Sequence, residues 1–246
     1  MNQCISARAR AVSVTLMVLS LSASTLAQCR PGYVLVGEDE HYWYCSTPAR
    51  AQDVQEVLQK ENSELLGDQW RFRKAIMEAV GALAREGRVY EYGGKLIIPA
   101  GGKTTYICVS DECRGSVEKG IDCSGAAAYG ELSACFVSGF CRAAGSSHPL
   151  DTSAAGQAEY FKRQKAFRSR TDTPLAGDLI FFKNTARKRK GITHVAIYIG
   201  TTRDGRTIIL HASSKAGAVI FGDLSKDLAK NIAGYGDSSR LFVTQK

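Results

Sequence analysis

The chain has 246 residues, of which 44% are hydrophobic and 23% charged, and its formal net charge is +8. This length is enough for one sizeable hydrophobic core and a small appendage. The sequence shows no internal repeat and no low-complexity tract, so a single main domain is expected.

Residues 1–27 have the features of a secretory signal peptide. Arg8 and Arg10 precede an uncharged run over residues 11–21, and small residues near Ala27 suit cleavage after that position. The run is well short of the roughly 20 residues that a membrane-spanning helix needs. We therefore expect export, to the periplasm or outside the cell, and a mature form of 219 residues with a net charge of +6.

Lipidation is the alternative fate of this N-terminus, because a cysteine, Cys29, follows the predicted cleavage site closely. The preceding residue, Gln28, is bulky where lipoprotein sites take a small residue, which disfavours this alternative. Nucleic acid is not expected as a partner of an exported protein that carries disulfides.

Seven of the eight cysteines remain after cleavage. In an oxidising compartment they can form disulfides, and proximity suggests three pairs: Cys29 with Cys45, Cys108 with Cys113, and Cys135 with Cys141. Six cysteines allow 15 connectivities, so this pairing is a hypothesis. Cys123 is left over as a free thiol. The spacings differ from Cys-x-x-Cys, so neither a metal site nor a cofactor is expected.

Residues 28–67 are expected to form a disulfide-tied loop or hairpin followed by a linker helix over 49–66. The stretch His41–Tyr44 is aromatic, and it either packs against its neighbour or binds a glycan or a protein partner through the 29–45 loop. Gly67 ends the linker helix.

A stronger helix begins with Asp68 as the predicted N-cap and ends at Gly87. Its apolar stripe consists of Phe72, Ile76, Val80 and Leu83. This spacing places the stripe on one face, which is expected to be buried in the core.

Cys123 opens the next helical stretch, which is predicted over 126–136 because of its alanines. The pattern then changes to period two, which predicts strands over 179–182, 194–199, 207–213 and 241–244. A loop containing Asp204 and Gly205 joins the middle two. Helices followed by antiparallel strands predict an α+β domain over 68–246.

The free thiol of Cys123 is a candidate nucleophile. A cysteine with a pKa near ~8.5 is mostly protonated at neutral pH. Asp122 is suited to the N-cap position, which places the sulfur at the positive end of a helix dipole. The dipole contributes only ~0.3–1 kcal/mol, so an imidazolium partner is required, and His194 is the candidate.

Alternation along 194–199 places Val195 on the face that packs against helices and leaves His194 on the other face. Pairing with the strand over 207–213 brings His211 opposite His194, where it can accept a hydrogen bond from Nδ1 and fix the tautomer. The set of nucleophile, base and orienting residue indicates a cysteine peptidase. His41 and His148 are interpreted as structural.

Five motifs occur in a consistent order along the chain. They are Tyr90-Glu91-Tyr92-Gly93-Gly94, Asp122-Cys123-Ser124-Gly125, Gly177-Asp178-Leu179, the strand His194 to Gly200, and His211-Ala212-Ser213. In this order they resemble the NlpC-type family of cell-wall cysteine peptidases, over roughly residues 68–243. The resemblance implies a compact papain-like fold, with Cys123 as nucleophile, His194 as base and His211 as the third member of the triad.

The resemblance also implies roles for three neighbouring residues. Tyr90 corresponds to a tyrosine whose hydroxyl helps to hold the oxyanion. Asp122 and Ser124 correspond to residues that contact the amino end of the substrate, although both can equally serve to cap the helix. The chain departs from the family pattern by insertions over 95–121 and 133–148, which are expected to wall the substrate groove.

The implied reaction is hydrolysis of peptidoglycan stem peptides by a monomer, through an acyl-enzyme. The bond is either γ-D-glutamyl-diaminopimelate or D-alanyl-diaminopimelate. An acyltransferase or amidase on the same scaffold, and a non-catalytic wall-binding module, are the alternatives. A basic loop suits an anionic wall polymer or is an ordinary solvated loop. It contains Lys183, Arg187, Lys188, Arg189 and Lys190.

Overall fold

The computed structural model describes residues 67–97, 105–108, 113, 119–138, 152–186 and 189–243, together with the backbone of 34–39 and 42–46. Several sequence predictions lie outside the described residues. They concern the signal peptide, lipidation at Cys29, the Cys29–Cys45 pair, the helix over 49–66, and the residues His41, Cys141 and His148.

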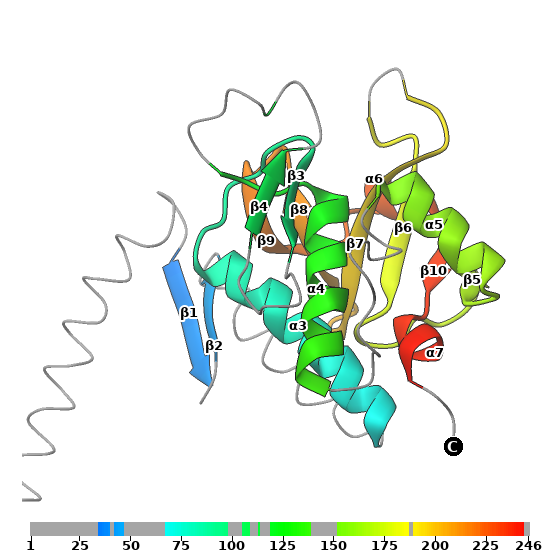
Figure 1. Cartoon of the computed structure of the whole chain (residues 1–246), viewed down its shortest axis with the longest axis horizontal. Helices are drawn as coiled ribbons and strands as arrows, with labels where there is room; N and C mark the ends of the chain where they lie inside the picture. The colour runs from blue at the N-terminus through cyan, green and yellow to red at the C-terminus, as the bar shows by residue number, and fades with distance from the viewer. Residues whose placement is uncertain are drawn as a thin grey trace, which may run out of the picture.

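A six-stranded antiparallel sheet forms the centre of the domain, with the strand order β5-β10-β6-β7-β8-β9 (Figure 1). Its strands are β5 (Phe167–Ser169), β6 (Leu179–Lys183), β7 (Ile192–Thr201), β8 (Thr207–Ser213), β9 (Ala218–Asp223) and β10 (Ile232–Gly236). The predicted strands over 179–182, 194–199 and 207–213 are confirmed. The sequence analysis did not predict β5, β9 and β10.

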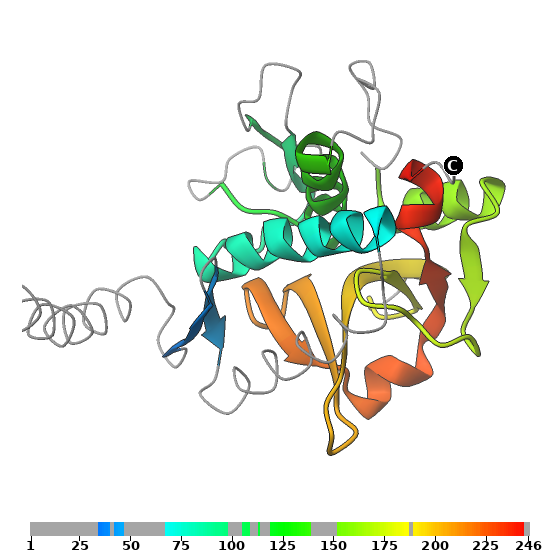
Figure 2. The ribbon, with the colours of Figure 1, turned by 90° about the horizontal axis from the view of Figure 1, so that it is seen from below.

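Within the described ranges, five helices accompany the sheet: α3 (Asp68–Arg85), α4 (Cys123–Ser138), α5 (Ala154–Arg163), α6 (Lys226–Lys230) and α7 (Ser238–Phe242). The first two pack against each other and cover one face of the sheet (Figure 2). None of the helices within the described residues is both long and apolar enough to cross a bilayer. Helices followed by an antiparallel sheet confirm the predicted α+β class.

Side chains alternate between the two faces of β7, as period-two patterning requires. Val195, Ile197 and Ile199 are buried in the core beneath α3 and α4. Ala196 and Tyr198 belong to a smaller apolar cluster on the opposite face, against which Leu228 of α6 packs. The predicted orientation of this strand is confirmed.

The ends of α3 differ partly from the prediction. Gly67 is the N-cap and Asp68 is the first helical residue, so the predicted N-cap is wrong by one position. The C-terminal end is confirmed, because Gly87 adopts φ +63°. The N–H of Arg88 donates to the carbonyl of Leu83 at 2.9 Å, which completes a Schellman motif.

Residues 241–243, the described part of the strand predicted over 241–244, are not a strand, which corrects the prediction. Asp237 is an N-cap whose side chain accepts a hydrogen bond from the N–H of Arg240, and it begins the short helix α7. The ring of Phe242 lies 5.6 Å from that of Phe72, between centroids. A helical turn therefore buries the apolar residues of this segment against α3.

Two hairpins lie outside the main sheet. The N-terminal one pairs β1 (Val34–Asp39) with β2 (Tyr42–Ser46), which confirms the predicted hairpin as a backbone feature. The other pairs β3 (Gly94–Ile97) with β4 (Thr105–Cys108) inside the first predicted insertion. The first residues of the second predicted insertion, from Ser133, belong to α4, in agreement with the helix predicted over 126–136.

Candidate active site

Three backbone segments meet where α4 begins, and glycines allow this close approach. A Cβ on Gly94 would lie 2.4 Å from the carbonyl oxygen of Gly120, and one on Gly125 would lie 2.5 Å from the carbonyl oxygen of Gly94. The N–H of Asp122 donates to that Gly94 carbonyl at 3.0 Å. The paired glycine and the Asp-Cys-Ser-Gly motif are therefore parts of one packed unit.

Asp122 caps α4 as the sequence predicted. Its Oδ1 accepts a hydrogen bond from the N–H of Gly125 at 2.6 Å, and its carbonyl accepts one from Ala126 at 2.9 Å. Cys123 is then the first residue of the helix, three residues before the stretch where the helix was predicted to start. Among the described cysteines it is the free one, and it is only partly buried.

Ser124 is buried and lies in the same hydrogen-bond network. Its hydroxyl donates to Oδ1 of Asp122 at 2.8 Å. Its carbonyl accepts a hydrogen bond from the side chain of Gln157 in α5 at 2.8 Å. Of the two roles considered for Asp122 and Ser124, the structure shows helix capping for Asp122 and internal hydrogen bonding for both.

Lys95 is a site residue that the sequence analysis missed. Its side chain is buried, and Nζ donates to Oδ1 of Asp122 at 3.0 Å and to the hydroxyl of Ser124. The residue directly follows the paired glycine, inside the segment that was interpreted as an insertion. Its position next to a motif was the one signal in the sequence that could have identified it.

The two predicted histidines are in contact. Nε2 of His194 in β7 lies 2.8 Å from Nδ1 of His211 in β8, and the rings meet edge to face. The predicted pairing across the two strands is confirmed, but the nitrogen is Nε2 and not the Nδ1 that was predicted. Nδ1 of His194 is therefore the nitrogen available for another partner.

Hydrogen bonding places the Cys123 sulfur near β7. Burial, together with the charge of Asp122, raises the pKa of the Cys123 thiol to about 11. Hydrogen bonding by the backbone N–H of Val195 opposes this shift, as do the charge of Lys95 and the backbone of Ser124. Because Val195 follows His194, the thiol lies next to the strand position that carries the predicted base.

Burial also keeps His194 neutral. It lowers the pKa of this imidazole to about 4, although the nearby charge of Asp122 raises it. The unliganded site therefore favours a neutral thiol beside a neutral imidazole, whereas the sequence analysis expected an imidazolium. The helix dipole, worth ~0.3–1 kcal/mol, is too weak to reverse the effect of burial.

Tyr90 lies beside the chain segment that precedes Cys123. It pairs with Ile121 in a parallel bridge, and its N–H donates to the carbonyl of Gly217 at 2.9 Å. The residue is half-buried against the core. The structure thus places Tyr90 beside the segment that leads into Asp122.

The basic loop before β7 reaches the tyrosine motif at one point. The Arg189 guanidinium lies over the ring of Tyr92, 5.1 Å from its centroid, and donates a hydrogen bond to its hydroxyl. Lys183 and Lys190 are exposed, and Arg187 and Lys188 lie outside the described residues.

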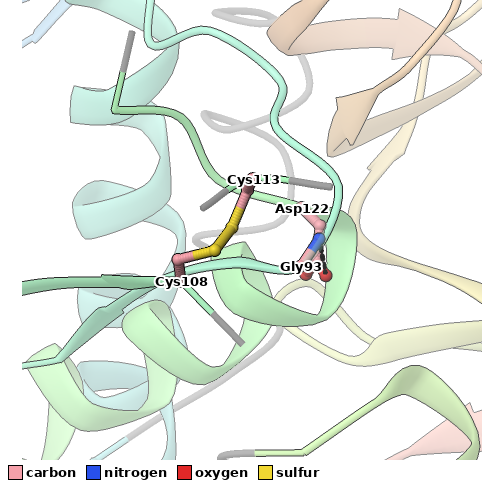
Figure 3. The surroundings of a disulfide bond; sticks show 4 residues. All are labelled: Gly93, Cys108, Cys113 and Asp122. Atoms are coloured by element: carbon pink, nitrogen blue, oxygen red, sulfur yellow. Dashed lines mark hydrogen bonds between the residues drawn. A yellow bond between two sulfur atoms is a disulfide. The ribbon is translucent and has the colours of Figure 1, made fainter. Parts of the chain in front are cut away.

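The predicted Cys108–Cys113 disulfide is confirmed. Cys108 pairs with Gly94 across the β3–β4 hairpin. Figure 3 shows the disulfide beside the hydrogen bond from the N–H of Gly93 to Asp122, whose length is 3.2 Å. This disulfide therefore supports the segment that holds Asp122. Cys135 is also disulfide-bonded, and its predicted partner lies outside the described residues.

The profile of the NlpC/P60 family matches residues 87–233, more than half of the chain. No curated protein sequence matches the chain.

Solved structures of the same family resemble this one. The P60 domain of an antigen from Mycobacterium avium subspecies paratuberculosis has 22% sequence identity and a TM-score of 0.42, covering 68% of this chain and 94% of its own. The peptidoglycan hydrolase RipB from Mycobacterium tuberculosis has 18% identity and a TM-score of 0.42, covering 78% and 85%. On the profile match, the chain belongs to the NlpC/P60 family of peptidoglycan hydrolases.

Proposed function

We propose that this protein is an exported cysteine endopeptidase that cleaves peptidoglycan stem peptides. Its substrate bond is γ-D-glutamyl-diaminopimelate or D-alanyl-diaminopimelate, as the family resemblance implies. One observation carries the proposal: the free thiol of Cys123 begins α4 next to Val195, whose neighbour His194 is hydrogen-bonded to His211. The predicted signal peptide is consistent with a substrate outside the cytoplasm.

Because the Cys123 thiol and the His194 imidazole are both neutral before substrate binds, the thiol proton is transferred during the attack on the substrate. As the Cys123 sulfur attacks the scissile carbonyl, Nδ1 of His194 accepts the thiol proton, and the hydrogen bond to His211 orients the ring. The C–N bond then breaks, and His194 returns the proton to the leaving amine. Water, deprotonated by the same imidazole, hydrolyses the thioester and regenerates the thiol.

Two groups are suited to hold the oxyanion. The backbone N–H of Cys123 is at the first position of α4, where the N–H groups of a helix have no partner within the helix. The hydroxyl of Tyr90 is the second donor that the resemblance implies. Removing one such donor typically costs about 10²–10³-fold in rate.

Mass spectrometry of purified muropeptides after incubation with the mature protein tests this proposal. We expect a product mass from the wild type that identifies the cleaved bond, and none from Cys123→Ala, because the variant lacks the attacking sulfur. Thermal unfolding of the variant should match the wild type. Cleavage by Cys123→Ala would exclude this nucleophile, and a transfer product would indicate an acyltransferase.

A further inference from the structure

The ammonium group of Lys95 lies among oxygens from three parts of the chain. Nζ is 3.0 Å from Oδ1 of Asp122 and 2.5 Å from Oγ of Ser124, and it donates to the carbonyl of Thr152 at 3.4 Å. Lys95 is 3% exposed, so solvent contributes little to its hydration. This position is a small, oxygen-lined ammonium site, and the protein fills it with its own side chain.

The acceptors of this position are fully used. An ionised carboxylate offers about four acceptor positions. Asp122 receives four donors: Nζ of Lys95, the hydroxyl of Ser124, and the N–H groups of Gly93 and Gly125. Three of these donors are on Oδ1, so the oxygen that faces Lys95 and Ser124 has no acceptor position left for an ammonium group brought by a ligand, and Oδ2 accepts from Gly93.

The charge of Lys95 also disfavours an ammonium group from a ligand at this position. Lys95 and Asp122 form a buried ion pair, with side chains 4% and 12% exposed. A second cation placed there would meet the charge of Lys95 in a poorly hydrated region, where like charges repel strongly. Asp122 and Ser124 flank Cys123 directly, so a group held by them would lie beside the scissile bond.

We propose that Lys95 determines substrate class: its ammonium fills the position beside Cys123, so the enzyme acts on stem peptides whose amino end is acylated and discriminates against free amino ends. A stem peptide is acylated in this way where it is joined to the glycan strand. Intact wall polymer is then the substrate, and released peptides are not. The inference rests on the proposed function.

Two matched substrates test the specificity. One stem peptide is prepared with a free amino end and again with an acetylated one, and kcat/KM is measured for both. We expect the wild type to prefer the acetylated peptide about 10-fold or more, because Lys95 repels the ammonium group of the free peptide. A 10-fold preference corresponds to about 1.4 kcal/mol. Lys95→Met, which keeps much of the buried stem, should lower that ratio at least 10-fold by gaining activity on the free peptide.

Lys74→Met is the matched control, because Lys74 lies on an exposed part of α3 and pairs with Glu78 in the same helix. It should keep the wild-type ratio. A wild type that cleaves the free peptide as fast as the acetylated one would overturn the proposal. An unchanged ratio in Lys95→Met would do the same.

A second measurement does not depend on hydrolysis. Lys95→Ala leaves the oxygens in place without their cation, so ethylammonium should bind there and raise Tm by about 4 °C or more. Wild type and Lys74→Ala should show no such shift. Absence of a shift in Lys95→Ala would overturn the ammonium site. A shift without cleavage of either peptide by the wild type would support the site and count against the proposed function.

Discussion

Two clusters of buried charge lie in this fold, and they are built differently. The site cluster consists of Lys95, Asp122 and Ser124 at the start of α4. The anchor cluster is centred on Arg73 of α3, which is 1% exposed and donates to Asp178 and Asp237 at 2.6 Å each. Both clusters pair their charges, as burial requires.

The difference lies in what surrounds the paired charges. In the anchor cluster, Arg73 also donates to Ser239 at 3.1 Å, and Arg168 donates to the second oxygen of Asp178. This network joins α3 and α7 to β5 and to the residue that precedes β6. The site cluster instead lies next to a thiol and an imidazole that burial keeps neutral. The anchor cluster therefore links separate elements of the fold, and the site cluster lies beside the groups that we propose to be catalytic.

Substituting the histidines should have the largest effect, and it should affect only activity. We expect His194→Ala to lower kcat/KM about 10²–10⁴-fold, the usual contribution of a general base. His211→Asn should lower it less, because this residue orients the base and does not transfer the proton. Rates on muropeptides and unfolding curves provide the measurements. Equal losses in the two variants would contradict the separate roles.

Substituting Arg73 should lower stability and leave activity nearly unchanged. Arg73→Met leaves Asp237 without its cationic partner and Asp178 with Arg168 alone, so we expect a loss of about 3–5 kcal/mol in the free energy of unfolding. Urea denaturation measures it. The kcat/KM of the remaining folded protein should stay near the wild-type value. A selective loss of activity without loss of stability would show that the clusters are coupled.

Glu131 of α4 adds a pH-dependent contribution near the anchor cluster. Burial raises the pKa of its carboxyl to about 8, against a hydrogen bond from Ser238 and the charge of Arg73. In the unfolded chain the carboxyl of Glu131 ionises near pH 4.5. The free energy of unfolding of the wild type should therefore fall as the pH rises from 4.5 to about 8. Between pH 5 and pH 8 the loss should be about 3–4 kcal/mol.

Glu131→Gln removes this titration. Urea denaturation across the same pH range should then show a flatter stability profile in the variant than in the wild type. Identical pH profiles would mean that Glu131 is ionised in the folded protein.

The disulfide should have the smallest effect. Replacing Cys108 and Cys113 by serine opens a loop with a sequence separation of 5. A loop of this size contributes about 2 kcal/mol in the chain-entropy description. Because Cys108 pairs with Gly94 beside the site, we also expect a modest loss of kcat/KM. Unchanged thermal unfolding would show that the hairpin holds without its covalent link.

Features that depend on local sequence patterns were predicted correctly. Alternation correctly oriented β7, and the spacing of His194 and His211 on neighbouring strands correctly brought their rings together. Asp122 was identified as an N-cap because the chemistry of capping is local. The choice of ring nitrogen was wrong, since it depends on the strand register and ring rotamers that only the fold defines.

Long-range burial was not predictable. Arg73 follows Phe72 on a helix whose apolar stripe gave no reason to bury a guanidinium. Its hydrogen-bond acceptors, Ala176, Asp178 and Asp237, lie 103, 105 and 164 residues further along the chain. Burial of Lys95 depends on the same kind of contact, because its acceptors lie 27, 29 and 57 residues further along the chain. The pKa shifts of Cys123 and His194 follow from burial and were therefore missed too.

The close contact between Gly94 and Gly120 has a consequence for how the chain can vary. These two glycines mark the ends of the segment 95–119, and their backbones meet at the start of α4. The entropic cost of closing a loop grows only slowly with its length. Adding residues to this segment should therefore cost little further entropy, so its length can change while Gly94 and Gly120 stay in contact.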